Sequence, residues 1–137
     1  MANALFDAGR EAFLNADIDW TADNIKVALV DSADYTVSLS THDFFSDVNA
    51  VGAAIVATSG NLASKTSTAG VADAADVTFT AVTGDVSEYL IIYKDTGTPA
   101  TSNLIAYIDT ATGLPVTPNG GDISVIWDSG ASKIFKL

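Results

Sequence analysis

The sequence of 137 residues contains no cysteine and only one histidine. The lack of cysteine excludes a disulfide scaffold, a thiolate metal site and a catalytic thiol. The single histidine, His42, cannot supply the two or three imidazoles of a usual zinc site. Thr41 and Asp43 flank it, and this pattern is typical of a helix start, where a short polar side chain caps the backbone. We therefore expect no catalytic histidine.

Basic residues are also scarce, since six of them face 17 acidic residues and the net charge is −11. Nucleic-acid binding relies on a clustered basic surface, and the six basic residues are scattered along the chain. A strongly negative surface repels both DNA and anionic membranes. No apolar run approaches the roughly 20 residues that span a bilayer, and the N-terminal residues lack the pattern of a signal peptide. We expect neither nucleic acid nor a membrane as a partner.

The length and the hydrophobic fraction of 48% fit one packed domain over residues 1–137. Between Asp76 and Asp109 the chain has three strand-like runs that Gly, Pro, Asp and Ser separate. In Val77–Val82, apolar residues alternate with threonine, as in a strand with one buried face. Tyr89–Tyr93 is apolar on both faces, which is typical of a central, doubly covered strand. We expect it to form the centre of the fold.

Similar patterns predict further strands, a weak edge strand over Leu62–Ser67 and an exposed loop over Thr68–Ala75. The other expected strands cover Ile25–Val30, Ala53–Ala57, Asn103–Asp109, Ile123–Trp127 and Lys133–Leu137. A second short helix is expected over Ser38–Val48. The fold class that follows is mainly β, an antiparallel β-sandwich or barrel of seven or eight strands with one or two short helices in the N-terminal 50 residues.

The first helix is expected over Asn3–Leu14, with Asn3 as its N-cap. Gly9 weakens this helix by about 1 kcal/mol relative to alanine, so we expect the helix to depend on docking. Residues 1–16 are then either a helical cap on the β-structure or an arm that orders against a neighbouring subunit. In the second case the expected interface residues are Leu5, Phe6, Phe13 and Leu14.

One acidic segment resembles the first half of a calcium-binding loop, with oxygen ligands at alternate positions. The residues at these positions are Asp17, Asp19, Thr21 and Asp23. The pattern fails at Ala22, where the loop needs glycine, and at Ala28, where it needs glutamate. Asp31 and Asp34 form a weaker pair. We expect a polar loop, with no bound metal and no cofactor.

The sequence also lacks motifs for catalysis. No Gly-x-Ser-x-Gly is present, no aspartate sits in an apolar run that raises its pKa, and Asn119–Asp122 lacks the lysine and the helix of a phosphate loop. Trp20, Trp127 and the tyrosines are candidates for a sugar-stacking surface, although Tyr89 and Tyr93 share one strand face, as core residues do. We expect no catalytic residues and no enzyme.

Blocks spread over most of the chain resemble small virion structural proteins of tailed bacteriophages. These blocks are Met1–Leu14, Ile18–Trp20, Ile25–Asp31, Val71–Gly84, Ile92–Thr98, Leu104–Asp109 and Pro118–Asp122. They consist of strands and turns and mark no active site. Within that group the best match is a decoration, or cement, protein of the capsid.

The resemblance implies a protein that is made in the host cytoplasm and then sits on the exterior of the capsid in the virion. Its partners are the major capsid protein and, as a further alternative, copies of itself. A tail- or fibre-associated virion protein is the second interpretation, with host-surface glycan binding through Trp20 or Trp127.

Overall fold

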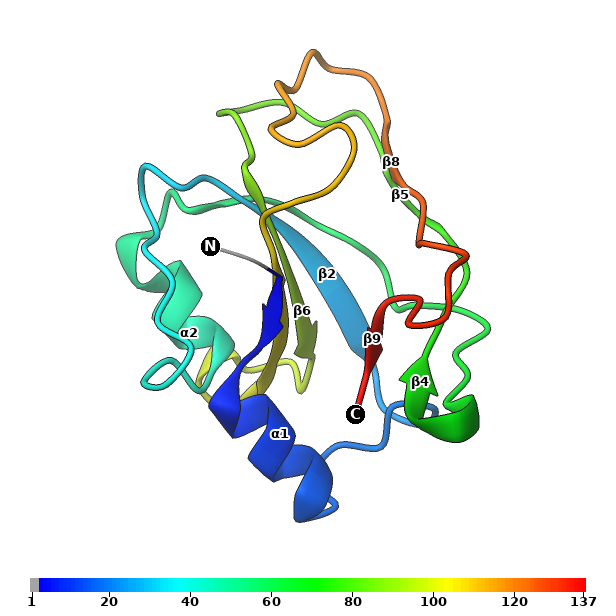
Figure 1. Ribbon diagram of the computed structural model, residues 1–137. Helices are drawn as coiled ribbons and strands as arrows, with labels where there is room; N and C mark the ends of the chain where they lie inside the picture. The colour runs from blue at the N-terminus through cyan, green and yellow to red at the C-terminus, as the bar shows by residue number, and fades with distance from the viewer. Residues whose placement is uncertain (1–2) are drawn as a thin grey trace.

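The structure is a computed structural model that describes residues 3–137 (Figure 1). Its helices are α1 (Asp7–Leu14) and α2 (Phe45–Val48), and 3-10 turns cover Asn49–Val51, Thr68–Gly70 and Pro99–Thr101. Its strands are β1 (Ala4–Leu5), β2 (Ile25–Val30), β3 (Ile55–Thr58), β4 (Val71–Ala72), β5 (Val77–Phe79), β6 (Tyr89–Lys94), β7 (Leu104–Ile108), β8 (Ile123–Val125) and β9 (Phe135–Lys136). The mainly β fold that the sequence predicts is confirmed, with both α-helices of the described residues in the first 50 positions.

The main sheet has five antiparallel strands in the order β1-β7-β6-β2-β3. Strand β6 lies in the middle, with Ile91 opposite Ala28 of β2 on one side and Tyr107 of β7 on the other. The prediction that Tyr89–Tyr93 forms the central strand is therefore confirmed. Two short antiparallel ribbons, β4–β9 and β5–β8, complete the described strands.

One face of the sheet packs against the two ribbons, in a sandwich-like arrangement (Figure 1). Leu90 and Ile92 of β6 point to this face and contact a core that includes Phe79 of β5 and Ala72 of β4. Phe135 of β9 packs against the same core. We call this the ribbon-side core.

The opposite face is covered by the segment between β2 and β3, which carries α2 (Figure 1). Here Ile91 and Tyr93 of β6 meet Tyr35, Phe45 and Val48 from that segment. The ring of Phe45 stacks on Tyr93, with ring centres 4.0 Å apart and the planes tilted by only 12°. Strand β6 thus has apolar contacts on both faces, as a central strand requires.

A bulge in β7 places two consecutive residues in the same core. Ile92 pairs with Ala106, but the next residue, Tyr93, pairs with Leu104, so Ile105 is an extra residue. Ile105 and Ala106 both belong to the ribbon-side core, although they are neighbours in the sequence. Such a bulge interrupts the strict alternation of a strand and bends it locally.

The first helix begins later than the sequence predicts, and Asn3 is not its N-cap. Helix α1 begins at Asp7, and the two residues of β1 pair with β7. The Oδ1 atom of Asn3 instead accepts hydrogen bonds of 3.0 Å from the N–H groups of Asp109 and Thr110. Pairing with a distant strand end overrides the local capping preference of Asn3.

The second predicted helix, Ser38–Val48, is also too long, because only Phe45–Val48 is α-helical. The capping role predicted for Thr41 or Asp43 belongs to Asp47. Its Oδ2 atom accepts the N–H groups of Asp43 at 2.8 Å and Phe44 at 3.0 Å. A carboxylate in the first turn thus satisfies backbone donors from inside the helix.

The weak edge strand predicted over Leu62–Ser67 is wrong, since only an isolated bridge joins Thr66 to Asp73 there. Strand β4 lies instead inside Thr68–Ala75, the segment predicted as an exposed loop. It forms because Val71 and Ala72 pair with Lys136 and Phe135 of β9. Strands β1 and β4 raise the number of strands in the described residues to nine, against the seven or eight expected.

Helix α1 packs closely on the sheet of its own chain, as the cap alternative requires. The N–H of Phe6 donates to the carbonyl oxygen of Ile105 at 3.0 Å, and the Phe6 side chain is fully buried. A Cβ atom at Gly9 would lie 2.6 Å from the carbonyl oxygen of Leu104, closer than real Cβ atoms approach. Gly9 therefore allows the helix to touch the backbone of β7.

We expect Gly9→Ala to lower the free energy of unfolding by about 1–3 kcal/mol, because the new methyl group meets backbone that cannot move aside. This loss has to exceed the gain of about 1 kcal/mol that alanine brings to a helix interior. Urea denaturation measures the difference. Gly60→Ala is the matched control, since a Cβ there meets nothing within 4 Å. An unchanged or raised stability of Gly9→Ala would contradict the close contact.

Candidate functional site

An apolar groove of about 370 Å³ lies between the C-terminal end of α1, the loop that follows it, and the β4–β9 ribbon. Its lining residues are Phe13, Ala16, Ile18, Asp19, Trp20, Thr21, Ser67, Gly70, Ala72, Phe135 and Leu137. The groove brings together the N-terminal helix and the last strand, which lie far apart in the sequence but on the same side of the sheet (Figure 1).

Three aromatic rings make the floor of the groove. The ring of Trp20 meets Phe135 nearly edge-on, with ring centres 5.2 Å apart, and Phe13 lies 5.9 Å from Phe135. The Nε1–H of Trp20 donates to the carbonyl oxygen of Asp73 at 3.2 Å. These contacts fix the rings and leave an apolar floor, because the polar atom of the indole is already bonded.

The groove includes one of the exposed large apolar side chains, Leu137. Among the described residues the exposed large hydrophobic side chains are Leu14 (87% exposed), Ile126 (77%) and Leu137 (58%). Leu137 lines the groove, and Leu14 stands in the sequence between the lining residues Phe13 and Ala16. Leu137 is therefore the exposed apolar side chain that the groove itself includes, and Leu14 adjoins it only through its neighbour Phe13.

The four interface residues expected from the sequence fall into different environments. Leu14 is exposed and Phe13 is a half-buried part of the groove lining. Leu5 is half-buried against the ribbon-side core. The prediction is wrong for Phe6, because its side chain is 0% exposed and so has no surface for a partner. It fills the core on the α2 side of its own sheet.

The segment that resembles a calcium loop uses its carboxylates to fold itself. Asp19 Oδ1 accepts the Thr21 hydroxyl at 2.8 Å, the Thr21 N–H at 3.0 Å and the Ala22 N–H at 3.1 Å. The hydroxyl of Thr21, followed by the N–H groups of Ala22 and Thr21, lowers the pKa of Asp19. Asp23 accepts the N–H of Asp19 and pairs with Lys94 at 3.1 Å. These bonds define a polar turn.

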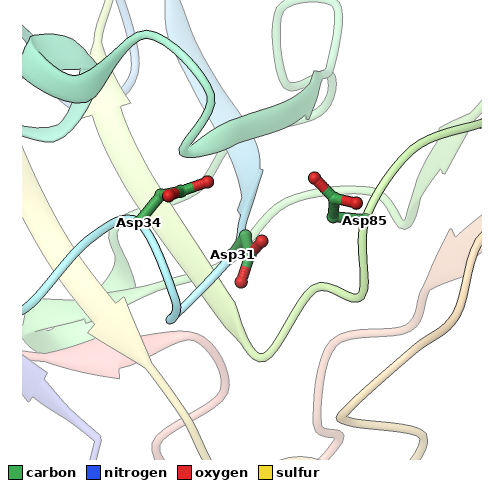
Figure 2. A group of neighbouring side chains, drawn as sticks. All are labelled: Asp31, Asp34 and Asp85. Carbon is green, nitrogen blue, oxygen red and sulfur yellow. The ribbon is translucent and has the colours of Figure 1, made fainter.

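The described carboxylates that lie close enough to share a cation are Asp31, Asp34 and Asp85, whose ligand atoms all fall within 4.8 Å of one another. Figure 2 shows Asp31 between the other two. Asp31 is buried, and its Oδ1 accepts the Ala33 N–H at 2.8 Å. Oxygen ligands of this kind suit a hard cation such as calcium, but the bond to Ala33 shows that Asp31 also closes a local turn.

Sequence reasoning found the pair Asp31 and Asp34 but missed Asp85. The register of the sheet places Val30, at the end of β2, opposite Tyr89, at the start of β6. The residues beyond these two strand ends therefore meet at one edge. The pairing of β2 with β6 would have predicted that Asp85 lies near Asp31 and Asp34, but this pairing cannot be read from the sequence.

His42 has a structural partner. Its Nδ1 lies 2.8 Å from the hydroxyl of Tyr35, and the two ring centres are 5.3 Å apart. Burial, together with the charge of Asp47, raises the pKa of Tyr35. Burial and the charge of Asp95 likewise raise the pKa of Tyr93 to about 12. The histidine thus joins two parts of the segment between β2 and β3 to each other.

The two tryptophans differ in exposure. Trp20 is only 5% exposed, so it offers no open ring face to a sugar. Trp127 is half-buried against the ribbon-side core, and its Nε1–H donates to the carbonyl oxygen of Ala75 at 3.1 Å.

Most basic side chains are already paired within the chain. The ion pairs are Lys26–Asp95 at 2.7 Å, Lys94–Asp23 at 3.1 Å, Lys133–Asp73 at 3.5 Å and Arg10–Asp7 at 2.9 Å. The hydrogen bond from Lys26 and the N–H of Gly97 lower the pKa of Asp95. Since 17 acidic residues face only six basic ones, the remaining surface charge is strongly negative.

Comparison with known proteins gives no family assignment: no family model matches the chain, and a search of curated proteins found no match. Within residues 3–137, every helix is too short or too polar to cross a membrane. The function has to be argued from the residues and their arrangement.

The bonds to Asp19 predict a pH-dependent stability. A carboxyl group whose pKa is lower in the folded chain stabilises the fold above its unfolded value of about 3.9, and this stability is lost as the pH falls through the folded pKa. We expect Asp19→Asn to melt below the wild type at neutral pH, with the two melting temperatures converging in acid. Calorimetry from neutral pH down to acid measures the two melting temperatures.

Glu11→Gln is the matched control, since it removes one negative charge from an exposed position on α1. It should follow the wild type at each pH. A difference for Asp19→Asn that persists in acid, or that reverses its sign at neutral pH, would contradict the role of the ionised carboxylate.

Proposed function

We propose that this chain is a structural protein of a tailed-bacteriophage virion, and more narrowly a decoration protein that binds the outer surface of the capsid and stabilises it. The resemblance of its sequence blocks supports the virion assignment. The observation that carries a binding role is the apolar groove, where Leu137 stays exposed on an acidic chain and the exposed Leu14 follows the lining residue Phe13. Apolar side chains gathered at one place mark an interaction surface more often than scattered ones do.

The covered sheet supports the same role. Both faces of β6 are buried, and the aromatic floor of the groove is fixed by ring contacts and a hydrogen bond. A surface that is ordered before binding loses less conformational entropy in the complex. A protein that stabilises a shell by attachment benefits from this rigidity.

Several polar residues that resemble site residues stabilise the fold instead. Asp19 and Asp23 close a turn, and His42 bonds to Tyr35. A protein that only binds a partner needs no catalytic role from these residues. We therefore propose that the chain is not an enzyme.

The charge supports a position outside the shell. Packaged DNA repels a protein of net charge −11, whereas the exterior of the capsid carries no such penalty. The proposed partner is the major capsid protein. The burial of Trp20 weakens the alternative of a fibre-associated glycan binder, which would have to rely on Trp127.

Quantitative gel analysis of purified virions tests this function. A decoration protein covers the shell, so we expect a copy number on the scale of that of the capsid protein. Particles produced without the chain should still assemble, and they should release DNA at a lower temperature than particles that carry it. A few copies per virion would contradict the decoration role, and absence from mature particles would contradict the virion assignment.

A further inference from the structure

We propose that the groove between α1 and the β4–β9 ribbon is the docking surface of this chain, and that its occupant is an apolar side chain of the capsid surface flanked by lysine or arginine. This inference rests on the proposed virion function and adds the residues and the partner chemistry.

The shape of the groove fits an inserted side chain. Its volume of about 370 Å³ lies within the common range of binding pockets, roughly 300–1,000 Å³. Phe13, Trp20 and Phe135 form the apolar floor, and Leu137 stands at the rim with 58% of its surface exposed. An apolar side chain placed there removes this surface from water, which is the main driving force of association.

The charge around the groove selects a basic partner. Asp19 lines it, and the bonds that lower its pKa keep its carboxylate ionised at neutral pH. None of the described lining residues is a lysine or an arginine. Lys94 lies beside the same loop, but it is paired with Asp23. Lys65 also acts on Asp19 and helps to lower its pKa. The chain as a whole still carries a net charge of −11, so a basic side chain next to an apolar anchor would meet a negative surface, and such complementarity increases the association rate and the specificity.

The same charge disfavours a second copy of this chain as the occupant. Each copy carries a net charge of −11, so two copies that share the groove would bring acidic loops together. Like charges across an interface suppress such pairing. A copy contact is therefore the competing outcome that the experiment has to separate.

The test uses a phage that lacks the gene and is grown in cells that supply the full-length chain or a variant. Leu137→Asp places a charge on a residue that lines the groove, and Leu14→Asp places one beside the lining residue Phe13. Ile126→Asp is the control, since Ile126 is 77% exposed and neither lines the groove nor adjoins a lining residue in the sequence. All three variants should have the melting temperature of the wild type, because the side chains are exposed. We expect both leucine variants to lower the copy number per particle about tenfold or more, because an unpaired carboxylate is costly to bury against an apolar side chain, and Ile126→Asp to be incorporated like the wild type.

Each other outcome has a definite meaning. Failure of the wild type itself to enter particles would overturn the proposed function. Normal incorporation of the folded groove variants, or an equal loss for Ile126→Asp, would overturn the docking surface and leave the function intact. If Leu137→Asp fails to fold, the result for Leu14→Asp decides between these outcomes.

Two further measurements test the partner chemistry. The wild type should be monomeric in sedimentation, and its release from particles should increase with sodium chloride, since salt screens the ionic part of the contact. A dimer that the groove variants dissociate would assign the groove to a second copy. Release that does not depend on salt would overturn the basic flank.

Discussion

The structure depends on the burial of one strand on both of its faces. Strand β6 has hydrogen-bonded neighbours in β2 and β7, and its side chains alternate between two apolar cores. A strand of this kind satisfies its backbone groups within the sheet and removes apolar surface from water on each side. Every other described element either extends this sheet or covers one of its faces. The bulge at Ile105 is a local adjustment that places two consecutive residues of β7, Ile105 and Ala106, in the ribbon-side core.

The groove follows from the way in which the ribbon-side face is covered. Two short ribbons and one short helix meet over this face without a continuous second sheet, so the boundary between α1 and β9 stays open (Figure 1). Trp20 and Phe135 close its floor, while Leu137 remains at the rim. Asp19 of the neighbouring loop stabilises a turn and is also the acidic residue that lines the groove. One local structure thus provides both the stability and the binding character that we propose.

The sequence predicted the elements whose patterns are local. Tyr89–Tyr93 is apolar at consecutive positions, and Ile25–Val30 is bounded by polar turns, so both strands and the mainly β class could be found. Strands β1 and β4 contain two residues each and exist only through partners far along the chain. The apolar stripe of the first helix predicted Phe13 and Leu14 as interface residues. It could not predict the groove, which also depends on Trp20 and on the pairing of β9 with β4. Phe6 shows the limit of the stripe, because a pattern of apolar residues does not tell whether they face a partner or their own core.

Native-state hydrogen exchange on the free chain tests most directly the claim that the doubly covered sheet holds the molecule together. We expect the amides of β2, β6 and β7 to exchange slowest, and with a common free energy equal to that of global unfolding. The residues around Leu14 and Leu137, at the rim of the groove, should exchange through smaller openings. Exchange of the β6 amides at a free energy well below that of global unfolding would contradict the account, because it would mean that one face of the sheet opens independently.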